Sequence, residues 1–281
     1  MKLRKILAAA AAMTLALTGC GGSGTDTAAE ALLQQAKETM ASVNSMASEM
    51  TMEMDMGMGM GGEVLETTTV ATILTQQEPL RMQMEMAMQM DDGTEMEEMQ
   101  MFAMEEDGKL KTYLYSADTW YEETLEMGEL DQYNAEENMD LYLDNIENFK
   151  ADGGEKIDGV ETTKISGVIT GEAMEEALAA SGMENSAASM GMTEEQLKAM
   201  YGELGDLPIS LWIDGEGYVR KYEMDMTEMM QKIMDSSMEA MGMTEADIAI
   251  DIAKTSITMV CGQFDQVGEI EIPVGVAAMM D

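Results

Sequence analysis

Methionine alternates with polar residues over long stretches of the chain, and this alternation restricts the fold more than any other feature. The first run comprises Met50, Met52, Met54, Met56, Met58 and Met60, with acidic residues, Thr and Gly between them. A second run comprises Met82, Met84, Met86, Met88 and Met90, and a shorter one lies around Met99 and Met101. Because successive side chains of a strand point to opposite faces, each run predicts a β-strand with one apolar face.

The intervening sequence predicts an antiparallel meander. Residues 64–75 are rich in Thr, Val and Ile, as is typical of a strand. Asp-Gly pairs at 92–93, 107–108 and 214–215 mark the joints, where Gly accepts the positive φ of a tight hairpin. Further strand patterns cover 162–170 and 248–264, a hairpin covers 207–225, and residues 270–273 are expected to close the sheet.

Helical spacing of apolar residues predicts several helices among the strands. The first covers residues 28–44 and opens with the capping box Thr27-Ala28-Ala29-Glu30. The others are expected over residues 136–149, 173–180, 193–204 and 227–241. Helices that interrupt a mostly antiparallel sheet indicate the α+β class. A helix followed by strands occurs twice, which is too weak an echo for a repeat, so we expect one domain over residues 28–281.

The N-terminus predicts export and lipidation. A cationic start at residues 1–5 precedes an apolar stretch at 6–17 that is too short to span a bilayer. Leu17-Thr18-Gly19-Cys20 resembles the lipobox of bacterial lipoproteins, which implies removal of residues 1–19 and diacylation of Cys20. The alternative is an ordinary secretory signal with a coincidental Cys. Residues 20–27 would then be the lipidated Cys and a flexible Gly-rich tether, and the protein would lie outside the cytoplasm, anchored to the cell membrane.

The charge of the chain restricts its partners. It has 55 acidic and 15 basic side chains, a net charge of −40. Such a field repels nucleic acid phosphates and anionic lipid headgroups, so we expect no nucleic acid partner. Membrane attachment must therefore come from the acyl chains, of which two or more make a durable anchor. The sequence identifies no protein partner.

The residues needed for common catalytic mechanisms are scarce. The chain has no His, so the usual general base and the commonest zinc ligand are absent. Asp214-Gly215-Glu216-Gly217 lacks the spacing of an EF-hand and is better interpreted as a hairpin turn. We expect a non-enzymatic protein without cofactor, catalytic residue or assigned metal ligand. Cys261 lies in an apolar run and is expected to be a buried core residue, because an acylated Cys20 leaves it no disulfide partner.

The methionine-rich strands allow several interpretations. Met adapts its shape at low cost, which suits a cavity for flexible apolar ligands, but it could equally fill an ordinary core. Thioethers also select Cu(I), yet alternate residues of one strand lie ~7 Å apart, so one strand cannot bring three sulfurs to one ion. A sacrificial role in oxidation also fits, although sulfoxides would disrupt a buried face.

Two short stretches carry a resemblance to a known family. They are Leu211-Trp212-Ile213-Asp214 with Gly217-Tyr218-Val219-Arg220-Lys221, and Phe264-Asp265-Gln266-Val267 with Ile270-Glu271-Ile272-Pro273. With the order of the predicted elements, they resemble LolA/LppX-like lipoproteins and clostridial lipoproteins of similar plan. The resemblance implies a strongly curved antiparallel sheet, a half-barrel packed around several helices, with an apolar cavity that holds acyl chains in relatives.

Our leading hypothesis is a membrane-anchored binder or carrier of a lipid or other apolar molecule. The alternatives are a cell-envelope structural or interaction module with a filled core and, third, a Cu(I)-binding protein. The residues expected to contact an apolar ligand are Met50, Met52, Met54, Met56, Met82, Met84, Met86, Met88, Met101, Ile209, Leu211 and Ile213.

Overall fold

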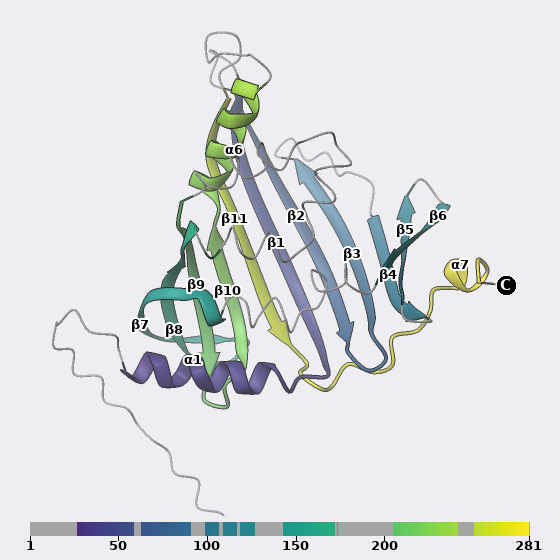
Figure 1. Ribbon diagram of the computed structural model, residues 1–281, viewed down its shortest axis with the longest axis horizontal. Coiled ribbons are helices and arrows are strands. Elements are labelled where there is room, and N and C mark those ends of the chain that lie inside the picture. The colour runs from purple at the N-terminus through teal and green to yellow at the C-terminus, as the bar shows by residue number, and fades with distance from the viewer. Residues whose placement is uncertain are drawn as a thin grey trace, which may run out of the picture.

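The computed structural model describes residues 27–58, 63–90, 99–106, 109–116, 119–126, 143–171, 173, 205–240 and 250–280. These residues form one open, antiparallel sheet of 11 strands in the order β6-β5-β4-β3-β2-β1-β11-β10-β9-β8-β7 (Figure 1). The strands β6 and β7 are its edges. An α+β fold with a curved antiparallel sheet is therefore confirmed.

The strands form two consecutive meanders joined at the first and last strands. The first comprises β1 (Ser45–Met58), β2 (Glu63–Gln76), β3 (Arg81–Met90), β4 (Met99–Glu106), β5 (Lys109–Ser116) and β6 (Thr119–Glu126). The second comprises β7 (Ile146–Ile157), β8 (Val160–Ile169), β9 (Leu207–Asp214), β10 (Val219–Asp225) and β11 (Ile250–Gly262). Pairing of β1 with both β2 and β11 unites the two meanders.

The register places the alternating methionines on one face. Met50 of β1 pairs with Ala71 of β2 and with Met259 of β11, and Ala71 pairs with Met86 of β3. Paired residues project to the same side, so these rows share one surface. We call this surface the methionine face and the opposite one the polar face. The methionine face includes Met46, Met50, Met52, Met54, Met56, Met82, Met84, Met86, Met88, Met90, Met99 and Met101.

Helix α1 (Thr27–Met40) covers the β8–β10 part of the methionine face. Its apolar stripe, which includes Leu33 and Ala36, packs against buried Ile165 and Leu211. The helix ends four residues earlier than predicted, because Ala41 to Asn44 form a turn in which the Asn44 N–H donates to Asp265 Oδ1. Of helices α1, α6 and α7, α1 alone gives buried residues to this main core, to which Leu143 of the short helical segment 143–145 also belongs. Packing around several helices is not confirmed.

Helix α6 (Thr227–Ala240) lies along the part of β11 that β10 does not reach. The side-chain amide of Gln231 makes the hydrogen bonds that a neighbouring strand would otherwise make with β11. Its Oε1 accepts the Ile252 N–H at 2.7 Å, and its Nε2 donates to the Ile250 carbonyl at 3.4 Å. Thr227 Oγ1 likewise accepts the Thr255 N–H. The predicted helix over residues 227–241 is thus confirmed for residues 227–240, and its side chains satisfy exposed strand-edge groups.

The expectation that residues 270–273 close the sheet is wrong. This segment runs across the polar face without strand pairing, and Ile270 is buried with Phe102 and Tyr113. The backbone of Ile270 is held by side chains: Arg81 donates to its carbonyl at 2.7 Å, and its N–H donates to Gln76. The one-turn helix α7 (Val274–Ala277) follows and adds Val276 to the same cluster.

The helix predicted over residues 136–149 is confirmed for residues 143–145 and is wrong for residues 146–149, which begin strand β7. Pairing with β8 and burial of Ile146 against α1 override the local helical pattern. Residues 136–142, the Asp-Gly pairs at 92–93 and 107–108, and, apart from Ala173, the helices predicted over 173–180 and 193–204 lie outside the described residues. No helix in the described ranges is both long and apolar enough to span a membrane.

We expect Gln231→Leu to lower the free energy of unfolding by about 1–3 kcal/mol, because the Ile252 N–H loses its partner. Urea unfolding followed by circular dichroism measures the change. Gln34→Leu, at an exposed position of α1, is the matched control and should stay within about 0.5 kcal/mol. Equal stability of the two variants would contradict the edge-capping role of Gln231.

Candidate functional site

The methionine face over β1, β2 and β3 is built from long side chains on either side of short ones. Met50 and Met86 flank Ala71, and Met52 and Met88 flank Thr69. Strands β1 and β3 stand about 10 Å apart, because each strand spacing is about 4.8 Å. Ala71 is fully buried and Thr69 is nearly so, whereas the flanking methionines are half-buried. The partly exposed layer of this region therefore consists of flexible thioether side chains, which lie on either side of the buried Ala71 and Thr69.

Over residues 46–56 of β1, 65–75 of β2 and 82–90 of β3, the described side chains of this face carry no charge. On the methionine face of these parts of β1, β2 and β3 and of residues 255–261 of β11, the described side chains are Met, Thr, Ser, Ile, Leu, Ala and Cys. Charged groups lie on the polar face, where Glu53 accepts a hydrogen bond from Lys254 at 2.9 Å. That bond raises the pKa of Lys254, which favours the charged form of this amine. An apolar molecule can therefore lie on this part of the methionine face without desolvating a charge.

The predicted contact residues fall into two groups. The nine methionines of the prediction lie together on β1, β3 and β4. Ile209, Leu211 and Ile213 lie on the same face of β9, but they are 2%, 0% and 1% exposed and belong to the core beneath α1. The structure thus does not bring these three residues to an open surface beside the methionines.

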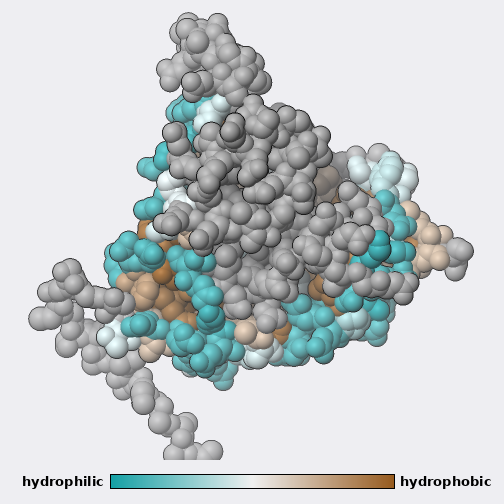
Figure 2. Space-filling model, viewed as in Figure 1, coloured by the Kyte–Doolittle hydropathy of each residue, from teal (hydrophilic) through white to brown (hydrophobic). Residues whose placement is uncertain are grey.

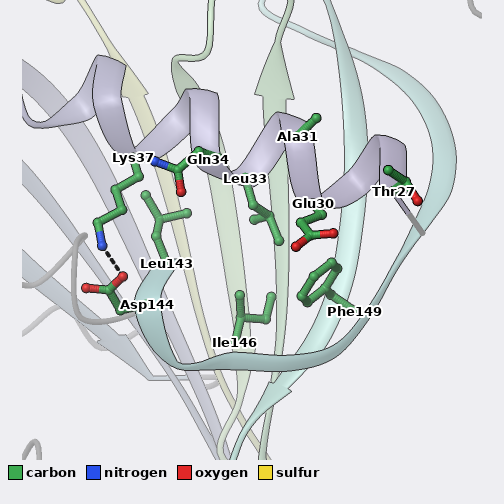
Figure 3. A pocket seen from close by; sticks show the side chains of 10 residues that line it. All are labelled: Thr27, Glu30, Ala31, Leu33, Gln34, Lys37, Leu143, Asp144, Ile146 and Phe149. Atoms are coloured by element: carbon green, nitrogen blue, oxygen red, sulfur yellow. Dashed lines mark hydrogen bonds and ion pairs between the residues drawn. The ribbon is translucent and has the colours of Figure 1, made fainter. Parts of the chain in front are cut away.

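A groove of about 480 Å³ lies between α1 and the start of β7 (Figure 3). Leu33, Leu143, Ile146 and Phe149 give it an apolar lining, and an ion pair between Lys37 and Asp144 lies at its side. The remaining lining residues are Thr27, Glu30, Ala31 and Gln34. Apolar surface is visible beside α1 in the same part of the molecule (Figure 2). The sequence analysis missed this groove because it placed Ile146 and Phe149 on a helix.

Asp214 is a structural residue of the β9–β10 hairpin. Its Oδ1 accepts the N–H groups of Glu216 and Tyr218 at 2.9 and 3.0 Å, and its Oδ2 accepts Arg220 Nε at 2.7 Å. The carboxylate is 3% exposed, and both of its oxygens accept hydrogen bonds from the protein. The turn interpretation is therefore confirmed. Within the described part of the chain, no group of three or more His, Cys, Asp or Glu side chains could hold a metal ion.

Cys261 is buried on the methionine face of β11, as the sequence predicts. Burial raises the pKa of its thiol to about 11. The Ser48 hydroxyl of β1 donates a hydrogen bond to Cys261 Sγ, with an Oγ–Sγ distance of 3.7 Å. A thiol in this setting is a small core side chain rather than a nucleophile.

Comparisons with known proteins give structural similarities only, since no protein-family model and no curated protein matches. LprF from Mycobacterium bovis is similar at 13% sequence identity and a TM-score of 0.47, over 89% of this chain and 98% of that one. Mycobacterium tuberculosis lipoprotein LppX is similar at 15% identity and a TM-score of 0.46, over 88% and 100%.

A third similar structure is a Vibrio parahaemolyticus domain described as an outer membrane lipoprotein-sorting protein. The identity is 8% and the TM-score 0.21, over 82% of this chain and 88% of that one. The predicted likeness to LolA/LppX-like lipoproteins is thus found among solved structures, and at these TM-scores it attaches no ligand or activity to this chain. The likeness to clostridial lipoproteins stays a prediction.

We expect Cys261 of the chain from residue 21 onward to react with iodoacetamide only after unfolding. With a pKa of about 11, only about one thiol in a thousand is ionised near pH 8, and burial also blocks access. Mass spectrometry of native and guanidinium-unfolded samples measures the difference. Modification of the native protein at the rate of the unfolded one would contradict the core assignment.

Proposed function

We propose that the protein is a membrane-anchored, extracytoplasmic lipoprotein that binds or carries a lipid or other apolar molecule without catalysing a reaction. The observation that supports this most directly is the methionine face over residues 46–56 of β1, 65–75 of β2 and 82–90 of β3, where the side chains carry no charge. A packed core is usually built from branched side chains that fix one arrangement, whereas thioether chains repack at low cost. Such a surface suits apolar ligands of variable shape.

The proposed contacts are the methionines of three strands. They are Met50, Met52, Met54 and Met56 of β1, Met82, Met84, Met86 and Met88 of β3, and Met101 of β4. The proposal gives a structural role to the three β9 residues Ile209, Leu211 and Ile213. Their packing under α1 holds the β9 part of the methionine face in position.

The anchor in this proposal is Cys20, which lies outside the described residues. Acylation of Cys20 would leave a short Gly-rich tether before Thr27, where α1 begins. The net charge of −40 disfavours direct docking on anionic lipid headgroups, so the acyl chains would carry the attachment. The tether would then hold the folded part at a short distance from the membrane surface.

The second candidate is a cell-envelope interaction module with a filled core. The packing of α1 on β8–β10 favours it, since Leu211 and Ile165 there are 0% exposed. In this case the methionine face would be covered by the protein itself. Native mass spectrometry of residues 21–281, followed by organic extraction, separates the two. A stoichiometric apolar adduct supports the binder, and a folded protein that stays free of lipid after loading supports the module.

We expect the double substitution Met84→Glu with Met86→Asp to weaken binding of an extracted or fluorescent apolar ligand at least about 30-fold, or ~2 kcal/mol. The reason is that the ligand would have to desolvate two carboxylates. Fluorescence titration measures the change, and circular dichroism checks the fold.

The matched control is Ala87→Glu with Gln89→Glu, which adds the same charge to the polar face of β3. These two positions are exposed, so the control should bind as the unmodified protein does. Equal affinity of both double variants would contradict the assignment of the methionine face.

A further inference from the structure

Strands β3 and β4 bring methionines together in a way that no single strand can. Their antiparallel register places Met84 directly opposite Met101, and Met86 directly opposite Met99. All of these side chains belong to the methionine face. We call Met84, Met86, Met99 and Met101 the methionine quartet.

The spacing within the quartet suits a metal ion. Directly opposed residues have Cβ atoms about 5 Å apart, and neighbours along one strand lie ~7 Å apart. A Met side chain has three rotatable bonds, so a sulfur atom can lean toward a point between the strands. Three or four thioether sulfurs can therefore converge on one ion above the centre of the quartet.

The other described methionines lack this arrangement. Met52 pairs with Thr69 and Ile257, and Met54 pairs with Thr67 and Thr255. The pair formed by Met50 and Met259 has Ala71 and Tyr222 as its outer neighbours. Among the described strands, only β3 and β4 thus set two methionine pairs side by side.

The strand neighbours of Met84, Met86 and Met101 in the described part of the chain are apolar, and part of the quartet is exposed to solvent. Ile73, Ala71 and Leu114 are the strand neighbours of Met84, Met86 and Met101. On this face of β4, Glu105 lies four residues from Met101, about 13 Å along the strand. Met99 is 47% exposed and Leu114 is 42% exposed, so an ion can reach the quartet from solvent.

We propose that the methionine quartet binds one soft monovalent cation, Cu(I) or Ag(I), through thioether sulfur alone. Thioethers favour Cu(I) over Zn²⁺, Mg²⁺ and Ca²⁺, which prefer nitrogen, thiolate or oxygen ligands. The chain has no His, and its one described Cys is the buried Cys261, so no stronger soft ligand competes. The net charge of −40 also raises the local concentration of cations.

The test is a titration of the lipid-free chain from residue 21 onward with Ag(I), a probe that needs no reducing agent. Native mass spectrometry counts the bound ions, and competition with a silver chelator gives the affinity. We expect the triple substitution of Met84, Met86 and Met101 by Leu to lower the affinity at least about tenfold. Leu conserves the volume closely enough to keep the fold, which circular dichroism verifies.

The matched control is the triple substitution of Met52, Met54 and Met56 by Leu, which removes the same number of thioethers from β1 and should leave the affinity unchanged. Equal losses in the two triple variants, or no binding tighter than that of free methionine, would overturn the proposal. If the first variant does not fold, Met99→Leu at the exposed position provides the same comparison, with an expected loss of about tenfold.

A second readout identifies the ligands directly. With ¹³C-methyl methionine labelling, Ag(I) should shift the signals of the quartet and leave those of Met52 and Met54 in place; shifts spread evenly over all methionines would overturn the site. Met84, Met86 and Met101 are also contacts in the proposed apolar site, but this titration uses no lipid. The result of the titration is therefore independent of whether the protein binds lipid.

Discussion

The register of β1 between β2 and β11 is the constraint on which the rest of the structure depends. Strand β1 pairs with β2 along its whole length, so its Met side chains and its Glu and Asp side chains lie on opposite faces. A slip of one residue would exchange the two faces and put Glu49 and Glu53 against the core. The bulge between Asp55 and Met56 adjusts the pairing with β11 and keeps Met56 on the methionine face, opposite Ile252.

Local patterns were sufficient where a segment depends on its own residues. Period-two alternation predicted β1 and β3 and the face on which each methionine lies, and the turn at Asp214 followed from its own sequence. Local patterns were insufficient where contacts with a segment distant in sequence determine the secondary structure. Residues 270–273 alternate like a strand, but Arg81 and Gln76 bind the backbone of Ile270 in place of another strand. Residues 146–149 likewise became a strand because β8 pairs with them.

The candidate sites show the same division between pattern and pairing. The sequence indicates that Met84 and Met101 lie on apolar strand faces, but only the register shows that they lie opposite each other. It also places Leu211 on the apolar face of its strand, but it does not indicate that α1 covers this residue. Composition gives the kind of contact a surface can make, whereas topology decides which side chains make it together.

The pairing of β1 with β11 also bears on how the chain is made. Residues 45–58 find half of their strand partners only in residues 250–262, so the centre of the sheet has a very long loop to close. Translation must reach the end of β11 before β1 can pair with a strand on each side. Until then the backbone groups of β1 that face β11 remain an unpaired strand edge, which is a site for pairing with another chain.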